Sequence, residues 1–389
     1  MKVTAALVAC IFYGCFLPQI VSALEILRTF REPDNRSFQH LRVHPSSGDV
    51  YLGGTDRLYR LGPDLSLSQS VTTGPREDNP SCPPPPLPCQ FHRVPTSAYT
   101  KALLVDDQAD EIIVCTSLYH GQCQTFRSSN ITLSLGFSRR PVVPSDPASS
   151  CVVFSSTARK SLIFLPDKDH IHGRNYSSSL SYSSRPSGRP FRSDRVLYVG
   201  AEYSNLGNDR KRRHLVPSIS RRMLPSWRLA SRDSEGASHF LVRPEYRDIF
   251  RIEFVYGFTR RGFAYFLTTQ PESVTASASS RRVTRLSRIC EADRYFRSYV
   301  EIPLACHGEG GLSSLIARAA SVTDDGDSLI MSFSSQNTST TEEKVSSSVC
   351  VFSMEELDRA FNTTVEDCYR GRSHLGPQHY HPRQKCTRT

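Results

Sequence analysis

The stretch Val50-Tyr51-Leu52-Gly53-Gly54-Thr55-Asp56-Arg57-Leu58-Tyr59-Arg60-Leu61 predicts a β-hairpin and decides the fold class. Its two arms are short and rich in Val, Leu and Tyr, and the Gly-Gly-Thr-Asp segment between them suits a tight turn. Similar runs of four to nine residues recur along the chain at 111–115, 151–154, 161–165, 195–199, 248–256, 262–267, 328–333 and 349–353. Many short strands without alternating helices favour an all-β sandwich or a β-propeller over a parallel α/β sheet.

One segment, residues 354–361, has the pattern of a helix. Met354, Leu357 and Phe361 share one face, and Asn362 stands where a helix would end. Four other segments are rich in Pro, Ser or Thr and have too few apolar residues to bury, so we expect exposed loops there. These segments are residues 80–88, 177–193, 276–282 and 334–348.

The N-terminus predicts export from the cell. Lys2 precedes an apolar run over residues 3–17, and Val21-Ser22-Ala23 matches the small-x-small pattern of a cleavage site. We therefore expect a signal peptide at residues 1–23 and a mature chain that begins at Leu24. The apolar run is shorter than the about 20 residues that span a bilayer. No later stretch suits a transmembrane helix, so membrane attachment would require a segment missing from this chain.

The cysteine count agrees with export. The chain has 12 cysteines, and two of them lie in the predicted signal peptide, which leaves an even number. An even count in an exported chain indicates disulfides. Cys82 and Cys89 bracket a proline-dense loop, and Cys115 and Cys123 bracket a hairpin. The spacings contain no paired C-x-x-C knuckles, which disfavours a zinc site.

Five Asn-x-Ser/Thr acceptors also fit an exported chain. They are Asn35, Asn130, Asn175, Asn337 and Asn362.

The sequence contains no motif that predicts catalysis. A nucleophile elbow, an H-E-x-x-H helix, a P-loop and a dinucleotide-binding loop are all missing, so we expect neither enzyme activity nor a cofactor. His374, His379 and His381 lie near Cys386, but the segment predicts a polar loop rather than a preorganised metal site.

The formal net charge is +10, with 48 Lys and Arg against 38 Asp and Glu. The arginines are spread along the chain, and exported proteins rarely meet nucleic acid, so we expect no nucleic-acid partner. A solvated basic surface that faces an acidic protein or a heparan-type glycan fits better. The run Arg210-Lys211-Arg212-Arg213 suits either an exposed loop or a site for a furin-type protease.

Several strings resemble the sema domains of plexins. The stretch Gly48–Leu61 resembles their first blade, with Asp56 in place of the usual Asn. The stretch 73–82, TGPREDNPSC, closely matches the plexin TGP-x-x-DNP-x-C string. The stretch 114–123 is similar to the plexin C-G-S-x-x-x-G-x-C hairpin, although Thr116 replaces the usual Gly. Val199-Gly200-Ala201 and residues 216–222 look like B-type plexins. The strings SYVEIPLAC at 298–306, VCVF at 349–352 and DCYRG at 367–371 follow in the family order.

The resemblance implies a seven-bladed β-propeller, with residues 24–389 forming a partial sema domain of roughly five blades. It implies the disulfides Cys82–Cys89, Cys115–Cys123, Cys306–Cys350 and Cys368–Cys386. Cys290 is similar to a family cysteine whose partner lies beyond Cys386, and Cys151 matches none. These two cysteines either pair with each other or leave one free.

The resemblance implies a cell-surface receptor that binds semaphorin ectodomains without a cofactor, in semaphorin–plexin signalling that guides axons and migrating cells. We expect the contact region at residues 195–222, in particular Arg212, Arg213, Arg221 and Arg222. Alternatives are a secreted decoy that ends at Thr389, the sema domain of a semaphorin or receptor kinase, and a propeller enzyme. The TGP…DNP-x-C string favours a plexin over the other sema proteins.

Overall fold

The computed structural model describes residues 28–83, 88–156, 195–203, 216–230, 232–233, 236–274, 281–306, 315–335, 347–372 and 379–381. The predicted signal peptide, the predicted strand at 161–165 and the loop at 177–193 lie outside these residues.

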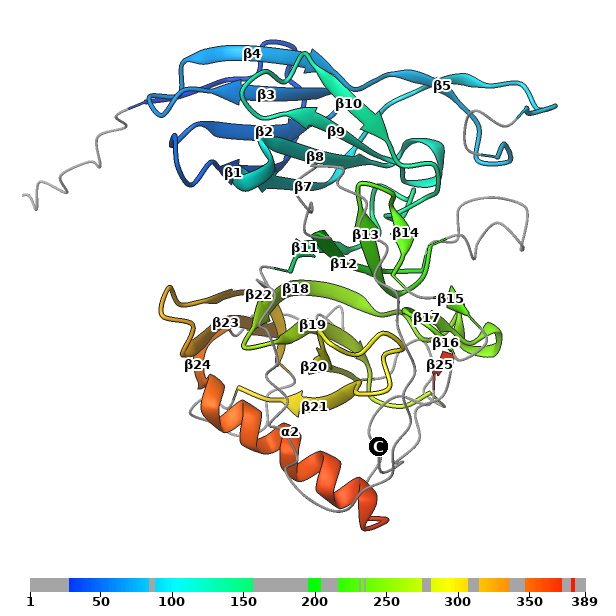
Figure 1. The fold of residues 1–389 in the computed structure, drawn as a ribbon, viewed down its shortest axis with the longest axis vertical. Helices are drawn as coiled ribbons and strands as arrows, with labels where there is room; N and C mark the ends of the chain where they lie inside the picture. The colour runs from blue at the N-terminus through cyan, green and yellow to red at the C-terminus, as the bar shows by residue number, and fades with distance from the viewer. Residues whose placement is uncertain are drawn as a thin grey trace, which may run out of the picture.

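The first two sheets are four-stranded antiparallel meanders, drawn blue to cyan in Figure 1. Sheet 1 consists of β1 (Phe38–Val43), β2 (Val50–Gly54), β3 (Arg57–Leu61) and β4 (Leu67–Thr72). Sheet 2 consists of β7 (Thr100–Asp106), β8 (Glu111–Thr116), β9 (Cys123–Arg127) and β10 (Ser134–Phe137). A short ribbon, β5 (Arg76–Asp78) with β6 (Val94–Thr96), links the two sheets along the chain.

Three further sheets follow in chain order. Sheet 3 consists of β11 (Cys151–Ser155), β12 (Arg195–Ala201), β13 (Ile219–Leu224) and β17 (His239–Val242), with β25 (Tyr380–His381) paired to β17 and β14 (Arg228–Leu229) paired to β13. Sheet 4 consists of β18 (Glu253–Arg260), β19 (Phe263–Pro271), β20 (Arg282–Cys290) and β21 (Val300–Leu304). Sheet 5 consists of β22 (Leu315–Val322), β23 (Ser328–Ser335) and β24 (Ser347–Ser353), which leads into helix α2 (Met354–Tyr369). A separate two-stranded ribbon pairs β15 (Arg232–Asp233) with β16 (Gly236–Ala237).

The sheets pack face to face in chain order. The first strand of each sheet contacts the first strand of the next, so β1, β7, β11, β18 and β22 meet in sequence. Separate apolar clusters fill the spaces between sheets 1 and 2, 2 and 3, 3 and 4, and 4 and 5. Successive meanders that share a row of first strands have the arrangement of propeller blades.

The hairpin that opens the sequence analysis forms as predicted, with Val50 opposite Leu61 and Gly53 opposite Leu58. Its turn needs a left-handed residue, and Asp56 supplies one with φ of 63°. The buried Asp56 carboxylate accepts a hydrogen bond from the Ala98 backbone N–H at 2.6 Å. The turn therefore joins sheet 1 to the segment that leads into sheet 2.

Gly53 of sheet 1 packs directly against Thr100 of sheet 2. A Cβ added at Gly53 would lie 2.5 Å from Thr100 Cγ2, and the Thr100 hydroxyl donates to the Gly54 carbonyl at 2.9 Å. We expect Gly53→Ala to lower the free energy of unfolding by about 1–2 kcal/mol, because overpacking forces the two sheets apart. Thr100→Ser removes the opposing methyl and keeps a hydroxyl, so adding it to Gly53→Ala should recover part of the loss in denaturant unfolding. An equal or larger loss in the double variant would contradict this explanation.

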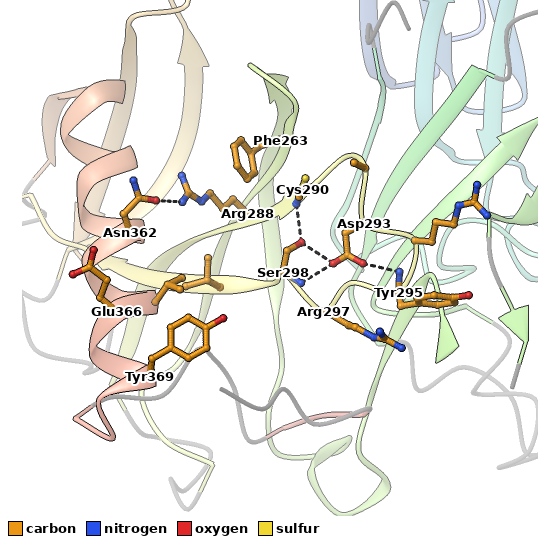
Figure 2. Close-up of a pocket in the computed structure, with 14 residues that line it drawn as sticks. Phe263, Arg288, Cys290, Asp293, Tyr295, Arg297, Ser298, Asn362, Glu366 and Tyr369 are labelled. Atoms are coloured by element: carbon orange, nitrogen blue, oxygen red, sulfur yellow. Dashed lines mark hydrogen bonds between the residues drawn. The ribbon is translucent and has the colours of Figure 1, made fainter. Parts of the chain in front are cut away.

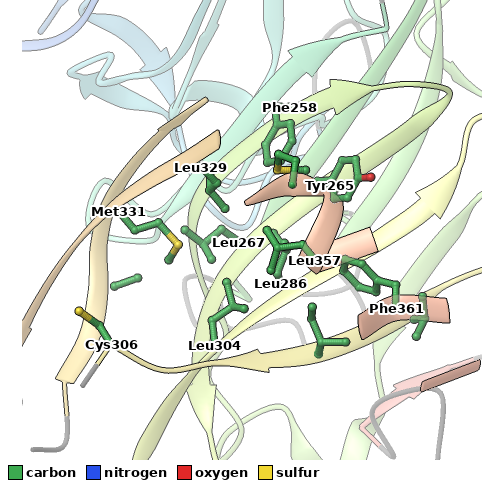
Figure 3. Close-up of a cluster of buried hydrophobic side chains, with 14 of the residues drawn as sticks. Phe258, Tyr265, Leu267, Leu286, Leu304, Cys306, Leu329, Met331, Leu357 and Phe361 are labelled. Carbon is green, nitrogen blue, oxygen red and sulfur yellow. The ribbon is translucent and has the colours of Figure 1, made fainter. Parts of the chain in front are cut away.

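The largest apolar cluster lies between sheets 4 and 5 and is closed by α2 (Figure 3). Leu267 and Leu286 face Leu329 and Met331 across this space, and Leu357 and Phe361 enter it from the helix. Phe361 is fully buried. The helix thus covers the joint between the two sheets.

Helix α2 corrects the predicted helix end, because it continues past Asn362 to Tyr369. It begins as expected, with Ser353 as N-cap accepting from the Glu356 N–H. The apolar face continues beyond Phe361 through the half-buried Val365 and the buried Cys368. Burial of that extended face outweighs the weak helix propensity of Asn362.

The predicted strand at 248–256 is also too long at its start. A 3-10 turn occupies Pro244–Tyr246, and the strand begins only at Glu253. Phe250 and Ile252 are buried nevertheless, 4% and 2% exposed, so they belong to the core without belonging to the sheet. Apolar content alone could not separate these two roles.

The outer faces of the first and last sheets carry exposed apolar side chains. On β1 they are Leu41 and Val43, which are 53% and 54% exposed. On sheet 5 they are Ile330, opposite Val351 in the ladder, and Val349, with Val349 reaching 69% exposure. On β23 the exposed Ile330 stands between the buried Leu329 and Met331, so sheet 5 has apolar residues on its two sides.

Candidate partner-binding site

The four arginines predicted to contact a partner do not lie together on one described surface. Arg212 and Arg213 lie outside the described residues. Arg221 and Arg222 are neighbours on β13, and successive residues of a strand point to opposite faces. Arg221 is half-buried, and its Nη1 donates to the Asp293 carbonyl at 3.4 Å.

The structure corrects the predicted partner contact of Arg222, because this residue is 3% exposed and points into the protein. Its Nε donates to Ser220 Oγ at 3.3 Å, and its Nη1 donates to the Trp227 carbonyl at 3.3 Å. Burial, aided by the charge of Arg140, lowers the pKa of the Arg222 guanidinium to about 10. Arg222 therefore supports the β13–β14 turn and offers no group to a partner.

The hydrogen bond of Arg221 reaches the loop of residues 291–299, whose conformation is held by Asp293. The Asp293 carboxylate accepts from the Tyr295 N–H at 2.9 Å, the Ser298 N–H at 2.6 Å and the Ser298 hydroxyl at 2.7 Å. Phe296, fully buried and with φ of 58°, anchors the loop in the core between sheets 3 and 4. This fixed turn leaves Arg294 and Arg297 exposed.

A cavity of about 770 Å³ separates this loop from α2, as Figure 2 shows. Asp293, Tyr295, Arg297 and Ser298 line one side, and Asn362, Glu366 and Tyr369 line the other. Phe263, Arg288 and Cys290 lie between these two walls. The walls come from sheet 4, from the loop before β21 and from a helix about seventy residues later in the chain.

Arg288 fixes the helical wall of the cavity. Its Nη1 donates to Asp358 Oδ1 at 3.0 Å and its Nη2 donates to Asn362 Oδ1 at 2.6 Å. The guanidinium lies 4.5 Å from the ring centre of Phe263 and 4.6 Å from that of Phe361. A guanidinium held between two rings and a carboxylate cannot reorient freely. Arg288 therefore holds α2 in a fixed position against β20.

A second group of buried polar residues lies between sheets 3 and 4. Tyr299 donates to Glu301 Oε1, and Gln270 Nε2 donates to Glu301 Oε2 at 3.4 Å. Burial raises the pKa of Glu301, against the opposing effect of Arg285, and burial also raises the pKa of Tyr299. Neither Tyr299 nor Glu301 lines the cavity beside α2.

Three disulfides join described cysteines, namely Cys82–Cys89, Cys115–Cys123 and Cys306–Cys350. They are three of the four pairs that the plexin resemblance implies. Cys368, buried on α2, is also disulfide-bonded, and its implied partner Cys386 lies outside the described residues.

Cys151 and Cys290 do not pair with each other, and both are free thiols. Burial raises the pKa of Cys151 to about 12, against the opposing effect of Lys101. A thiol with a raised pKa carries little thiolate, so Cys151 is a poor nucleophile.

Three of the five predicted glycosylation sites lie in described residues, and the asparagines of all three are exposed: Asn35, Asn130 and Asn362. Asn175 and Asn337 lie outside the described residues. Glycan attachment at these positions stays a prediction.

Within the described ranges, no group of three or more His, Cys, Asp or Glu side chains could hold a metal ion. Of the histidines near Cys386, His379 is buried against Phe250 at 4.0 Å between ring centres, and His374 lies outside the described residues.

Sequence reasoning missed the 291–299 loop as a candidate site. The signal was present, because Arg288, Arg294 and Arg297 alternate with Tyr295 and Phe296 in ten residues. Cations interleaved with aromatic residues often mark contact surfaces.

The chain is 31% identical over 373 residues to Plexin-A4 of Danio rerio, a match that covers 89% of this chain and 18% of the relative. Plexin-B1 of Homo sapiens is also 31% identical, over 368 residues that cover 89% of this chain and 15% of the relative. The solved plexin A4 extracellular region matches with a TM-score of 0.69 and 25% identity, over 94% of this chain and 40% of that chain. The chain is a plexin homologue.

The plexin homologue spans less than a fifth of the length of these two relatives. Its five sheets are blades of a sema β-propeller, because the chain shares the fold of the plexin A4 extracellular region. A structure of Drosophila Plexin A in complex with Semaphorin 1b has the same fold, with a TM-score of 0.50 at 13% identity over 87% of this chain and 56% of that chain. No protein-family model matches the chain.

The B-type strings do not separate this plexin homologue from A-type relatives, because its identity to Plexin-A4 and to Plexin-B1 is the same. None of the helices in the described ranges has the length and apolarity needed to cross a membrane. Homology to an extracellular region indicates that the plexin homologue is extracellular or at the cell surface.

Proposed function

We propose that this chain is the semaphorin-binding, extracellular part of a plexin-type receptor. The observation that carries this proposal is the match to plexins over 89% of the chain. A structural neighbour belongs to a solved complex of Drosophila Plexin A with Semaphorin 1b, which supports the same class of partner here. Both matched relatives are named as plexins.

In this proposal a signal peptide at 1–23 directs export, and residues 24–389 belong to one sema domain. Recognition depends on shape and charge at the surface of the blades and requires no cofactor. The chain acts at the outer face of the plasma membrane, in semaphorin–plexin signalling of the kind that guides axons and migrating cells. The basic surface also suits a heparan-type glycan, as the net charge of +10 predicts.

The test is binding of the full chain, secreted from animal cells through its own signal peptide, to a panel of semaphorin ectodomains. We expect saturable binding to at least one semaphorin, measured by surface plasmon resonance with the semaphorin immobilised. An unrelated extracellular β-propeller of similar net charge serves as the control for electrostatic adsorption. Monodisperse secreted chain that binds none of the panel would overturn the proposal.

A further inference from the structure

We propose that the cavity between α2 and the 291–299 loop is the docking pocket for an acidic side chain flanked by an apolar one, presented by the semaphorin. This inference rests on the proposed function and deepens it, because it assigns the chemistry of the contact. It moves the centre of the predicted contact away from Arg222, which is buried.

The charges that face the cavity leave a cation available. Three arginines and two carboxylates line it, and most of these groups already have partners. Asp293 is occupied by three donors of its own loop, and Glu366 lies 3.7 Å from Arg370 on the next helical turn. Arg288 is held by Asp358. Arg294 is exposed and has no ion pair or hydrogen bond with any described residue. An unpaired, exposed guanidinium at a cavity is complementary to a carboxylate.

The backbone that carries this cation is fixed before any partner arrives. Phe296 is buried on one side of Arg294, and the Asp293 turn holds the loop on the other. Arg297 lies over the Tyr295 ring at 4.9 Å from its centre, which holds a second guanidinium at the same rim. A preorganised loop loses little conformational entropy on binding, so its contacts contribute more to affinity.

The remaining lining is apolar and defines the other half of the ligand. Phe263, Val300 and Val365 line the cavity, and Tyr369 is 41% exposed at the end of α2. The volume of about 770 Å³ exceeds what one carboxylate fills, and lies in the range of sites that take several groups at once. An aliphatic or aromatic side chain beside the acidic one would bury against this wall. Tyr and Arg together are the residues that most often dominate protein interfaces.

The number of exposed cations disfavours a sulfated glycan as occupant. Long polyanions bind rows of cations, whereas the described lining of the cavity offers two exposed arginines, Arg294 and Arg297. The observations therefore favour a protein segment with one acidic group, and the glycan becomes an outcome of the test.

The experiment compares three secreted full-length chains for binding to the semaphorin that the wild type binds. In the first, Arg294→Glu and Arg297→Glu reverse the rim. In the second, Tyr369→Ala removes the aromatic wall. The third, Arg139→Glu, makes the same kind of charge reversal on an exposed arginine of the loop after β10, outside this cavity. Far-ultraviolet circular dichroism and size-exclusion elution check that each chain is folded.

We expect the rim reversal and Tyr369→Ala each to weaken semaphorin binding about tenfold or more, while Arg139→Glu changes it less than about twofold. Equal affinity of the rim reversal and the wild type would overturn the pocket and leave the proposed function standing. The pocket would also be overturned if the rim reversal lost its retention on a heparin column while its affinity for the semaphorin stayed unchanged. That result would assign the rim to a sulfated glycan. A wild type that binds no semaphorin would overturn both proposals.

Discussion

Removing the Cys306–Cys350 disulfide is expected to lower the free energy of unfolding by about 4 kcal/mol. The bridge joins the segment just after β21 to β24, and its two cysteines are 44 residues apart. Sheet 4 and sheet 5 are therefore covalently linked beside the apolar cluster that α2 covers (Figure 3). Without the bridge, the unfolded chain gains the entropy of an open loop of that length.

The measurement is equilibrium unfolding in denaturant without reductant, on the secreted chain with Cys306→Ala and Cys350→Ala. The matched control removes Cys82 and Cys89 in the same way, because that bridge spans only 7 residues. The same loop-entropy relation gives about 2.5 kcal/mol for the shorter loop. We expect the 306–350 variant to lose more stability than the control. Equal losses would show that the bridge does not act by restricting the unfolded chain.

Local sequence signals predicted the elements whose stability is local. The hairpin at Val50–Leu61 forms because apolar arms and a turn that admits left-handed residues lie in twelve consecutive positions. The start of α2 forms where Ser353 can cap it. Strand β7 was missed, although its centre is Ala102-Leu103-Leu104. Those residues read equally well as helix, and only their burial between sheets 1 and 3 makes them a strand.

The errors arose where partners distant in the sequence decide the outcome. Arg222 looks like an exposed cation in the string Ile-Ser-Arg-Arg-Met-Leu, yet the carbonyl that accepts from it belongs to Trp227 in a turn created by the fold. Helix α2 extends past Asn362 because Arg288 of β20 holds that side chain and the face beyond it is buried. Neither partner could be identified from spacing.

The candidate site was out of reach of the sequence for the same reason. Its two walls, the 291–299 loop and the last turns of α2, are about seventy residues apart and meet only because α2 folds back over β21. The basic and aromatic composition of the loop was visible in the sequence. That it faces a cavity, and that Arg294 is its one described cation without a partner, required the fold.

Acidification is expected to destabilise the fold through His379, which precedes β25. The ring is 1% exposed and stacks on Phe250 at 4.0 Å and beside Tyr380 at 4.4 Å between ring centres. Its Nε2 is buried without a hydrogen-bond partner among the described residues. Burial, aided by the nearby charge of Arg285, holds the pKa of His379 well below its usual value of 6.5.

The direction of the pH effect on stability follows from proton uptake by the folded and unfolded states. Below pH 6.5 the imidazole of the unfolded chain takes up a proton while the buried imidazole does not, so the unfolded state binds more protons. The stability contributed by neutral His379 is present above pH 6.5 and falls by about 1.4 kcal/mol for each pH unit below it, until the folded-state pKa is reached.

Glu301 acts in the opposite direction and must be separated from this effect. Burial raises its pKa above 4.5, so the folded state takes up a proton before the unfolded state does, and acidification adds stability in that window. Arg285 lies near both groups. A pH profile of the wild type alone would therefore underestimate the contribution of His379.

The difference between the wild type and His379→Phe isolates it, because Glu301 is common to both chains. Phenylalanine keeps the ring stack against Phe250 and removes the titrating group. We expect the stability of the wild type relative to His379→Phe to fall by about 1.4 kcal/mol between pH 7.5 and pH 5.5, measured by denaturant unfolding. His92→Phe, which replaces an exposed imidazole, is the matched control. A difference that stays constant over this range would show that His379 can ionise in the folded chain, and hence that the ring is not sealed between Phe250 and Tyr380.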